Sequence, residues 1–266
     1  MKTKKLMIVF VLLFIPHLAS ASVISLTTTV STDIMTEDFT KIHVKLLNSG
    51  DEPAYNVQMS LLLSSSFNSE PIFIETLDPN EPFEADFDVT LTEEIIPGNY
   101  PIVILTDYAD ANGYPFSSVS PSFIVYKTRK LSKVSGGIPT LSLSGKKSKD
   151  IILNIRNLDD IPHDVEVKLF LPRELKVVDE ERTLSIGAKD EEQLDFEVSS
   201  LSALIGSSYI VLASMEYEYE DSHYSSFGRG VIKIEEEKPF EFPIWVPILS
   251  FVVLLIIFLY YFIRRK

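Results

Sequence analysis

Histidine, serine and the acidic residues are the side chains that could supply chemistry in this chain, because it contains no cysteine. Apart from one histidine in the apolar N-terminal segment, the histidines are His43, His163 and His223. None has a partner at the spacing of a metal-ligand motif, and the many serines have no evident base. The sequence also lacks a nucleophile elbow, a glycine-rich phosphate loop and an HExxH motif. It therefore predicts a protein that is not an enzyme.

Three oxygen-bearing residues lie close together in the sequence: Asp107, Asp110 and Asn112. Their side chains are of the kind that binds calcium, which takes six to eight oxygen ligands. The spacing differs from that of an EF-hand, and residues 110–113 also read as a hairpin turn, because Asn and Gly tolerate positive φ. A calcium site and a capped turn both stay open, and no other cofactor is predicted.

Acidic and aromatic residues alternate between Glu216 and Asp221. The carboxylates share one face of a predicted strand, and tyrosines lie among them. Tyr217, Tyr219 and the nearby Tyr224 are candidates for a row of rings that binds carbohydrate. Two other interpretations are a contact surface for a partner and a strand edge that its charges protect from aggregation.

Alternating apolar and polar residues predict that β-strands position these groups. Ile42, Val44 and Leu46 share one face of a strand. Further strands are predicted at 72–76, 85–91, 100–107 and 118–126, and later at 191–199, 209–217 and 230–235. About seven short strands in about 105 residues are typical of an immunoglobulin-like β-sandwich.

An internal duplication divides this strand-rich region into two modules. The sequence NSGDEP at 48–53 returns as NLDDIP at 157–162, and ADFDV at 85–89 returns as LDFEV at 194–198. The sequence therefore predicts a first sandwich at 22–126, a linker at 127–137 and a second sandwich at 138–235. The linker carries Lys127, Arg129, Lys130 and Lys133, which either solvate it or bind an acidic partner.

Both ends of the chain carry membrane signals. Residues 1–21 have the basic, apolar and A-x-A regions of a signal peptide. Residues 244–263 contain no charge and are long enough for one membrane-spanning helix. The residues predicted to anchor this helix at the two interfaces are Trp245, Tyr260, Tyr261, Arg264, Arg265 and Lys266.

These ends fix the predicted topology and fold class. The positive-inside rule keeps the tail at 264–266 in the cytoplasm and places the modules outside, joined to the membrane by a spacer at 236–243. The predicted fold is all-β, with two tandem immunoglobulin-like β-sandwiches followed by one transmembrane α-helix.

Charge limits the partners of the exported region. It carries 18 basic against 38 acidic residues, a net charge of −20. Such a surface repels nucleic acid and anionic headgroups, so no nucleic-acid partner is predicted. A domain without disulfides must hold its fold by core burial alone.

Several motifs of the first module resemble archaeal S-layer-like extracellular modules and, more loosely, the CARDB type of adhesion-related β-sandwich. They are the run at 48–57, the strand at 87–89, the turn at 97–100 and the hairpin at 108–113. The second module departs from this pattern, with Asp159 in place of Gly50 and Ile205 in place of Pro97. The resemblance implies an immunoglobulin-like fold and a place in the cell envelope, and it implies no catalytic residue.

The sequence thus predicts a non-catalytic, single-pass type I protein of the cell membrane, with its modules on the extracellular side. The expected role is surface-layer association, adhesion or protein binding, with envelope or membrane proteins as partners. One alternative is an accessory subunit of a membrane transport or secretion complex. Another is a carbohydrate-binding surface protein.

Overall fold

The computed structural model describes residues 23–144, 148–236, 249, 251–254, 256 and 264. The first module contains strands β1 (Leu26–Thr32), β2 (Ile34–Met35), β3 (Phe39–Asn48), β4 (Ala54–Leu62), β5 (Phe67–Ser69), β6 (Ile72–Leu77), β7 (Pro82–Leu91), β8 (Gly98–Ala109) and β9 (Pro115–Tyr126). The second contains β10 (Val134–Gly137), β11 (Leu141–Ser144), β12 (Lys149–Asn157), β13 (His163–Phe170), β14 (Leu175–Val177), β15 (Glu181–Ile186), β16 (Glu191–Ser200), β17 (Ser208–Tyr219) and β18 (Ser222–Glu235).

Each module is a sandwich of two mainly antiparallel sheets. In the first module, one sheet has the order β1-β3-β7-β5, and the other joins β2, β9, β8, β4 and β6. In the second, β10-β12-β16-β14 faces a sheet of β15, β13, β17, β18 and β11. We call the first sheet of each module its outer sheet and the other its inner sheet. The predicted all-β fold, with a two-sheet sandwich in each module, is confirmed.

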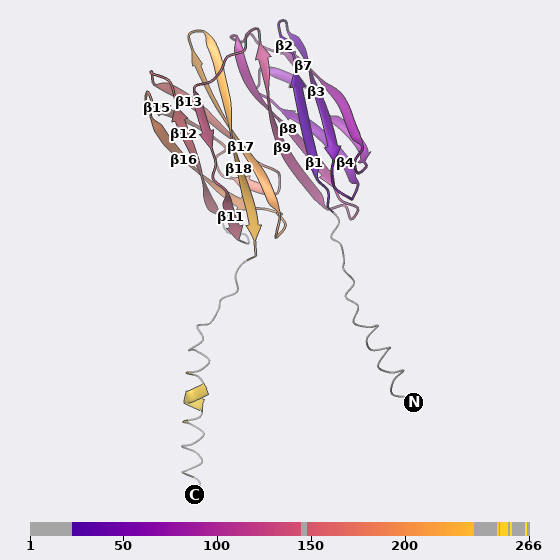
Figure 1. Cartoon of the computed structure of the whole chain (residues 1–266), viewed down its shortest axis with the longest axis vertical. Coiled ribbons are helices and arrows are strands. Elements are labelled where there is room, and N and C mark those ends of the chain that lie inside the picture. The colour runs from indigo at the N-terminus through magenta and orange to yellow at the C-terminus, as the bar shows by residue number, and fades with distance from the viewer. Residues whose placement is uncertain are drawn as a thin grey trace.

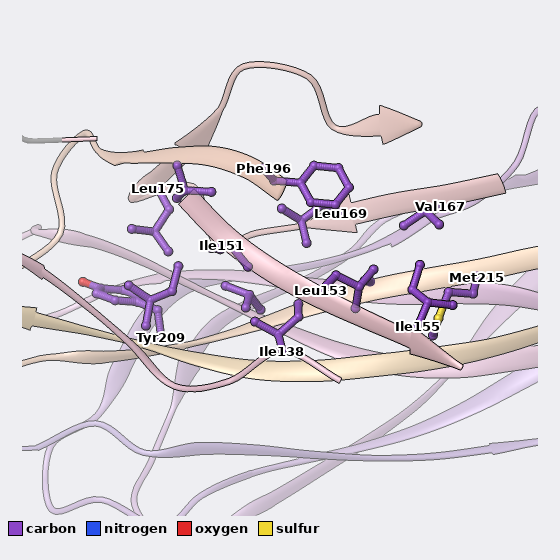
Figure 2. Close-up of a cluster of buried hydrophobic side chains, with 14 of the residues drawn as sticks. Ile138, Ile151, Leu153, Ile155, Val167, Leu169, Leu175, Phe196, Tyr209 and Met215 are labelled. Atoms are coloured by element: carbon purple, nitrogen blue, oxygen red, sulfur yellow. The ribbon is translucent and has the colours of Figure 1, made fainter. Parts of the chain in front are cut away.

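Side-chain alternation along the strands builds the two cores. In β3, Ile42, Val44 and Leu46 are fully buried, while the residues between them face solvent. β12 repeats this pattern with three aliphatic residues that Figure 2 shows beside residues of the neighbouring strands: Ile151, Leu153 and Ile155. Phe87 and Phe196, which are 109 residues apart, lie in their respective cores and are 1% and 0% exposed.

The duplicated asparagines perform the same structural task in both modules. The side-chain amide of Asn48 donates to the carbonyl of Glu52 at 2.7 Å and to that of Leu77 at 3.3 Å. The amide of Asn157 donates to Ile161 at 2.8 Å and to Gly187 at 2.9 Å. Each asparagine thereby ties its own turn to a neighbouring strand connection. The duplication seen in the sequence is therefore a duplication of buried hydrogen bonds as well as of strands.

The second module begins earlier than predicted. Val134 lies within the range 127–137 expected to be a linker, yet it is the first residue of β10 and pairs with Asn157 of β12. Val134 is fully buried in the second core. The sequence Ser135-Gly136-Gly137 is typical of a linker, yet its backbone pairs with β12. The connection between the modules is therefore limited to residues 127–133.

The two modules stand side by side and antiparallel, as Figure 1 shows. β18 is the counterpart of β9 in the repeat, and β9 runs antiparallel to β8. β18 itself runs parallel to β8, to which it is joined by the pair His223 and Gly98. The second module is therefore inverted relative to the first. As a result, β1 begins and β18 ends at the same end of the molecule.

Most of the predicted membrane segments lie outside the described residues. These include the signal peptide at 1–21, the interface residues Trp245, Tyr260, Tyr261, Arg265 and Lys266, and much of the span at 244–263. Within that span the described residues are 249, 251–254 and 256, which are helical, as is Arg264. In the described part of the chain, no helix has the length and apolarity needed to cross a membrane.

Replacing Asn157 by alanine should destabilise the fold by about 2–4 kcal/mol, because the buried carbonyls of Ile161 and Gly187 lose their donor. The measurement is urea unfolding of the full chain in detergent, followed by the near-UV circular dichroism of its tyrosines. Asn154→Ala is the matched control, since this asparagine is exposed on the same strand and its side-chain oxygen accepts a bond from the exposed Gln193. Equal losses for the two variants would contradict the assignment.

Acid should weaken the turn that contains Asp159. The bond from Lys133 at 2.9 Å, together with the amide of Asp160 and the ring of His163, lowers the pKa of Asp159 to about 2. A lowered folded-state pKa gives stability that is present above the unfolded value of about 3.9 and is lost as the pH falls toward 2. Asp159→Asn should therefore flatten the dependence of the melting temperature on pH between about 4 and 2. Asp160→Asn, at a highly exposed neighbour, should leave that slope intact.

Candidate binding surface at the junction of the modules

An apolar seam joins the inner sheets of the two modules. Val103, Leu105 and Val119 of the first module meet Leu212 of the second, and all four are buried. Phe123 and Phe227 add a ring contact across the seam, with centroids 5.1 Å apart. Burial of this kind contributes roughly 25 cal/mol per Å² of apolar surface. The seam is thus a third core, formed by both modules.

The seam explains an apolar run that alternation does not. In β8, residues 102–105 are all buried, because Ile102 and Ile104 face the first core while Val103 and Leu105 face the seam. Residues 211–213 of β17 are likewise buried on both faces. Strands covered on both sides read as continuous apolar runs. The continuous apolar run at 102–105 is the signal in the sequence that indicates this second covering surface.

A buried carboxylate crosses the junction beside the seam. Glu174 of the second module is 2% exposed, and its two oxygens accept bonds from the backbone N–H and the hydroxyl of Ser117, both at 2.7 Å. The Ser117 hydroxyl also accepts a bond from the N–H of Arg173 at 2.7 Å. A buried carboxylate is tolerated only when its oxygens are satisfied in this way. This contact fixes the register of one module against the other.

Asp107, one of the predicted calcium ligands, takes part in the same junction. Its carboxylate forms an ion pair with Arg173 at 2.8 Å. Burial raises the pKa of Asp107, and the guanidinium of Arg173 opposes that rise. Asp107 therefore connects the modules, a role that its position in the sequence did not indicate.

Asp110 and Asn112 lie in the turn after β8. The Asp110 carboxylate accepts bonds from the N–H groups of Asn112 at 2.9 Å and Tyr114 at 2.8 Å. The bond from Tyr114 is the main cause that lowers the pKa of Asp110. The structure thus shows the capped turn. Among the described residues no group of three or more acidic or histidine side chains is arranged to hold a metal, and calcium binding stays a prediction.

The far end of the junction is built around His223. Its ring stacks on that of Tyr100 from the first module, with centroids 4.2 Å apart and planes 3° from parallel. Nε2 lies 3.1 Å from a carboxylate oxygen of Glu216, and the backbone N–H donates to Pro97 at 2.9 Å. Burial is the main cause that raises the pKa of the Tyr100 phenol. His223 was predicted only to lack a metal partner, and its role at the junction was missed.

An acidic cleft of about 960 Å³ opens beside this corner. It lies between the modules, and residues from both line it, among them Glu94, Tyr100, Glu166, Lys168, Glu216 and Glu218. Burial, reinforced by the neighbouring carboxylate of Glu181, raises the pKa of Glu166. A basic side chain of a partner would reduce the electrostatic repulsion among these carboxylates.

A smaller cleft of about 490 Å³ lies at the opposite end of the junction. Tyr108, Phe116 and Tyr209 supply aromatic surface, and Leu204 and Val23 also line the cleft. The Tyr108 and Phe116 rings stack with centroids 5.6 Å apart. Burial raises the pKa of Tyr108 to about 12, so its phenol stays neutral at any physiological pH.

The predicted tyrosine row is not a row of exposed rings. Tyr217 is buried in the second core and stacks on Tyr224, with centroids 5.1 Å apart. Its hydroxyl accepts a bond from the N–H of Lys133 at 3.1 Å. Tyr219 is 38% exposed. The prediction that Tyr217 offers its ring to a sugar is wrong, because alternation turns this residue toward the core.

The two other histidines lie away from the junction. His43 is exposed on β3 and bonds to Asp86 at 2.9 Å, as a surface residue of an alternating strand should. His163 is buried, packs on Tyr217 with centroids 4.3 Å apart and bonds to Asp159 at 3.2 Å. The structure does not bring these residues together with His223.

Comparison with known proteins gives structural matches alone. No protein-family model and no curated protein matches the sequence. The native alpha-2-macroglobulin of E. coli matches with a TM-score of 0.35 and 10% identity, over 81% of this chain and 17% of that one. A Salmonella alpha-2-macroglobulin mutant, Y1175G, matches with 0.34 and 11%, over 81% and 16%.

A third match is a protein of unknown function from Porphyromonas gingivalis W83. Its TM-score is 0.32 at 13% identity, over 77% of this chain and 98% of that one. The chain thus spans about one sixth of the length of the macroglobulins it matches.

Replacing Leu212 by aspartate should separate the modules without unfolding either. Leu212 is fully buried in the seam and is not part of either sandwich core, so an unpaired charge there opposes docking alone. We expect one cooperative thermal transition for the natural chain and two for the variant, measured by calorimetry of the full chain in detergent.

Leu131→Asp serves as the control, because this leucine is 81% exposed in the connection between the modules. It should retain one transition. A single unchanged transition for Leu212→Asp would show that the seam does not couple the modules.

Proposed function

We propose that this chain is a non-catalytic, single-pass protein of the cell envelope that holds its paired modules outside the membrane as one rigid body for binding other envelope proteins. One feature carries the proposal: β1 begins and β18 ends at the same end of the paired modules. An anchor that follows β18 would therefore place this end of both modules near the membrane and the opposite end away from it.

The membrane anchor is supported by the sequence and by the described residues within it. Residues 244–263 carry no charge. Those of the stretch that are described are helical, and their exposed apolar side chains include Phe251 at 67% and Leu254 at 64%. A helix that exposes such side chains all round is suited to lipid rather than to water. The orientation with the basic tail inside follows from the positive-inside rule.

The binding role is supported by the surfaces that the junction creates. Both clefts are lined by residues from the two modules, so a ligand in either cleft would contact both at once. The seam and the Glu174 contact hold these surfaces in a fixed relation. Preformed surfaces of this kind reduce the entropic cost of binding.

The envelope assignment also draws on the resemblance to S-layer-like and CARDB-type modules. Surface-layer association and adhesion are the roles that this resemblance favours. Each described histidine bonds to a carboxylate of a neighbouring strand or turn, namely Asp86, Asp159 or Glu216. This use of the histidines is structural and fits a protein without catalysis.

Amine-reactive crosslinking in intact cells, followed by mass spectrometry of the full chain, tests this function. We expect crosslinks to other envelope proteins from Lys168 and Lys176, which line the larger cleft. Lys41 and Lys45, on the outer sheet of the first module, provide the comparison. Leu212→Asp should reduce the cleft crosslinks by several-fold, because it separates the two walls of the cleft.

Two outcomes would contradict the proposal. Crosslinks confined to one polytopic membrane protein would make the chain an accessory subunit of that complex. Cleft crosslinks that persist unchanged in Leu212→Asp would show that binding does not require the paired modules.

A further inference from the structure

The loop between β16 and β17 exposes apolar side chains in an unusual setting. Leu201, Leu204 and Ile205 are 59%, 39% and 66% exposed. No charged residue occurs between Glu197 and Glu216, in a chain in which 23% of residues are charged. Solvation alone does not account for an uncharged loop with exposed apolar side chains in a strongly acidic protein. A set of exposed leucine and isoleucine side chains on one loop marks a contact surface.

This loop lies where the chain leaves the modules. The N–H of Gly206 donates to the carbonyl of Ile234 at 2.8 Å, and the N–H of Ile234 donates to Ser207 at 2.9 Å. The loop is therefore hydrogen-bonded to the C-terminal end of β18, whose last residue is Glu235. The hydroxyl of Tyr114 holds it from the other module through the carbonyl of Ser202 at 2.6 Å.

The other copy of the loop provides an internal comparison. Residues 93–96 are Glu-Glu-Ile-Ile, and their counterparts at 201–204, next to Ile205 in place of Pro97, are Leu-Ser-Ala-Leu. Because the modules are antiparallel, the acidic copy lies at the end far from Glu235, beside His223. There Ile95 is half-buried against the first core. The copy near the chain exit has lost both charges, and its apolar side chains face outward.

The distance to the proposed anchor is short. Residues 236–243 can span at most about 28 Å when fully extended, which is the largest possible separation between the end of β18 and the start of the proposed anchor. Charged groups of both signs lie near the loop: Glu235, Asp110 and Lys233, whose backbone pairs with Ser208, so charge gives no net attraction to an anionic surface. Contact with a bilayer would thus come from apolar insertion rather than from charge attraction.

We propose that the tip formed by Leu201, Leu204 and Ile205 inserts into the headgroup–acyl boundary of the bilayer that holds the chain's own anchor. This inference rests on the proposed function, since it requires residues 244–263 to lie in that bilayer. Apolar side chains of interfacial helices reach roughly 5–10 Å into this boundary, and we expect a similar depth for the loop. The loop and the anchor helix then give the paired modules two points of contact with the bilayer, which limits their rotation relative to the membrane plane.

Depth-dependent fluorescence quenching tests the insertion. The chain has no cysteine, so Ile205→Cys can be labelled uniquely with a nitrobenzoxadiazole dye. The full chain is reconstituted into phosphatidylcholine vesicles that contain a lipid with a nitroxide near the top of its acyl chain. We expect the Ile205 dye to be strongly quenched by the lipid nitroxide and shielded several-fold from aqueous iodide.

Two further positions keep the outcomes distinct. Leu131→Cys is the exposed control at the opposite end, because β18 alone spans about 45 Å between the two ends. A dye there should respond to iodide and not to the nitroxide. Val253→Cys lies within the proposed anchor and should be quenched by a nitroxide placed deep in the acyl chain. Loss of that signal would overturn the proposed function itself.

The loop inference fails if Val253 reports lipid while Ile205 responds to iodide as Leu131 does. It also fails if the Ile205 dye is shielded from iodide but not quenched by lipid, since a protein surface, such as a second copy, would then cover the tip. The double variant Ser202→Glu, Ala203→Glu places two carboxylates in the loop and keeps its three exposed apolar side chains. It should abolish nitroxide quenching at Ile205 and leave the signal at Val253 unchanged.

Discussion

Burial of the apolar seam between the inner sheets is the interaction on which the rest of this structure depends. Val103 and Leu212 are fully enclosed by it, and each belongs to the strand that also supplies the core of its own module. Without the seam, the side chains of Val103, Leu105, Val119 and Leu212 would be exposed to water. The two clefts, the buried carboxylate of Glu174 and the stacked rings of Tyr100 and His223 exist only because the seam brings the modules together.

Polar contacts then select one alignment along that apolar surface. Hydrophobic burial has little directional preference, so two flat faces could slide or rotate on one another. Glu174 binds the backbone and hydroxyl of Ser117 at one position, and Arg173 pairs with Asp107 beside it. A shift of one residue would leave a buried carboxylate unsatisfied, which costs more than the bonds themselves contribute.

The sequence was sufficient to predict the modules, because their information is local. Alternation at Ile42, Val44 and Leu46 and the repeated asparagines at 48 and 157 specify strands, faces and turns within about 100 residues. The junction could not be derived in the same way, since residues from distant parts of the chain create it. Ser117 and Glu174 carry no motif, and His223 has no partner at the spacing of a metal-ligand motif. The doubly buried run at 102–105 was the one available signal, and it indicates a covering surface without naming it.

The antiparallel arrangement of the repeats has a consequence for assembly. One inverted copy set against another, through the same sheet, is the geometry of a two-fold homodimer, here joined by residues 127–133 into a single polypeptide. Such a chain has already used its natural self-association face internally. Any larger assembly must therefore be built through the outer sheets, where Lys41, Lys45, Glu84 and Asp86 form charged ladders, or through the ends of the sandwiches.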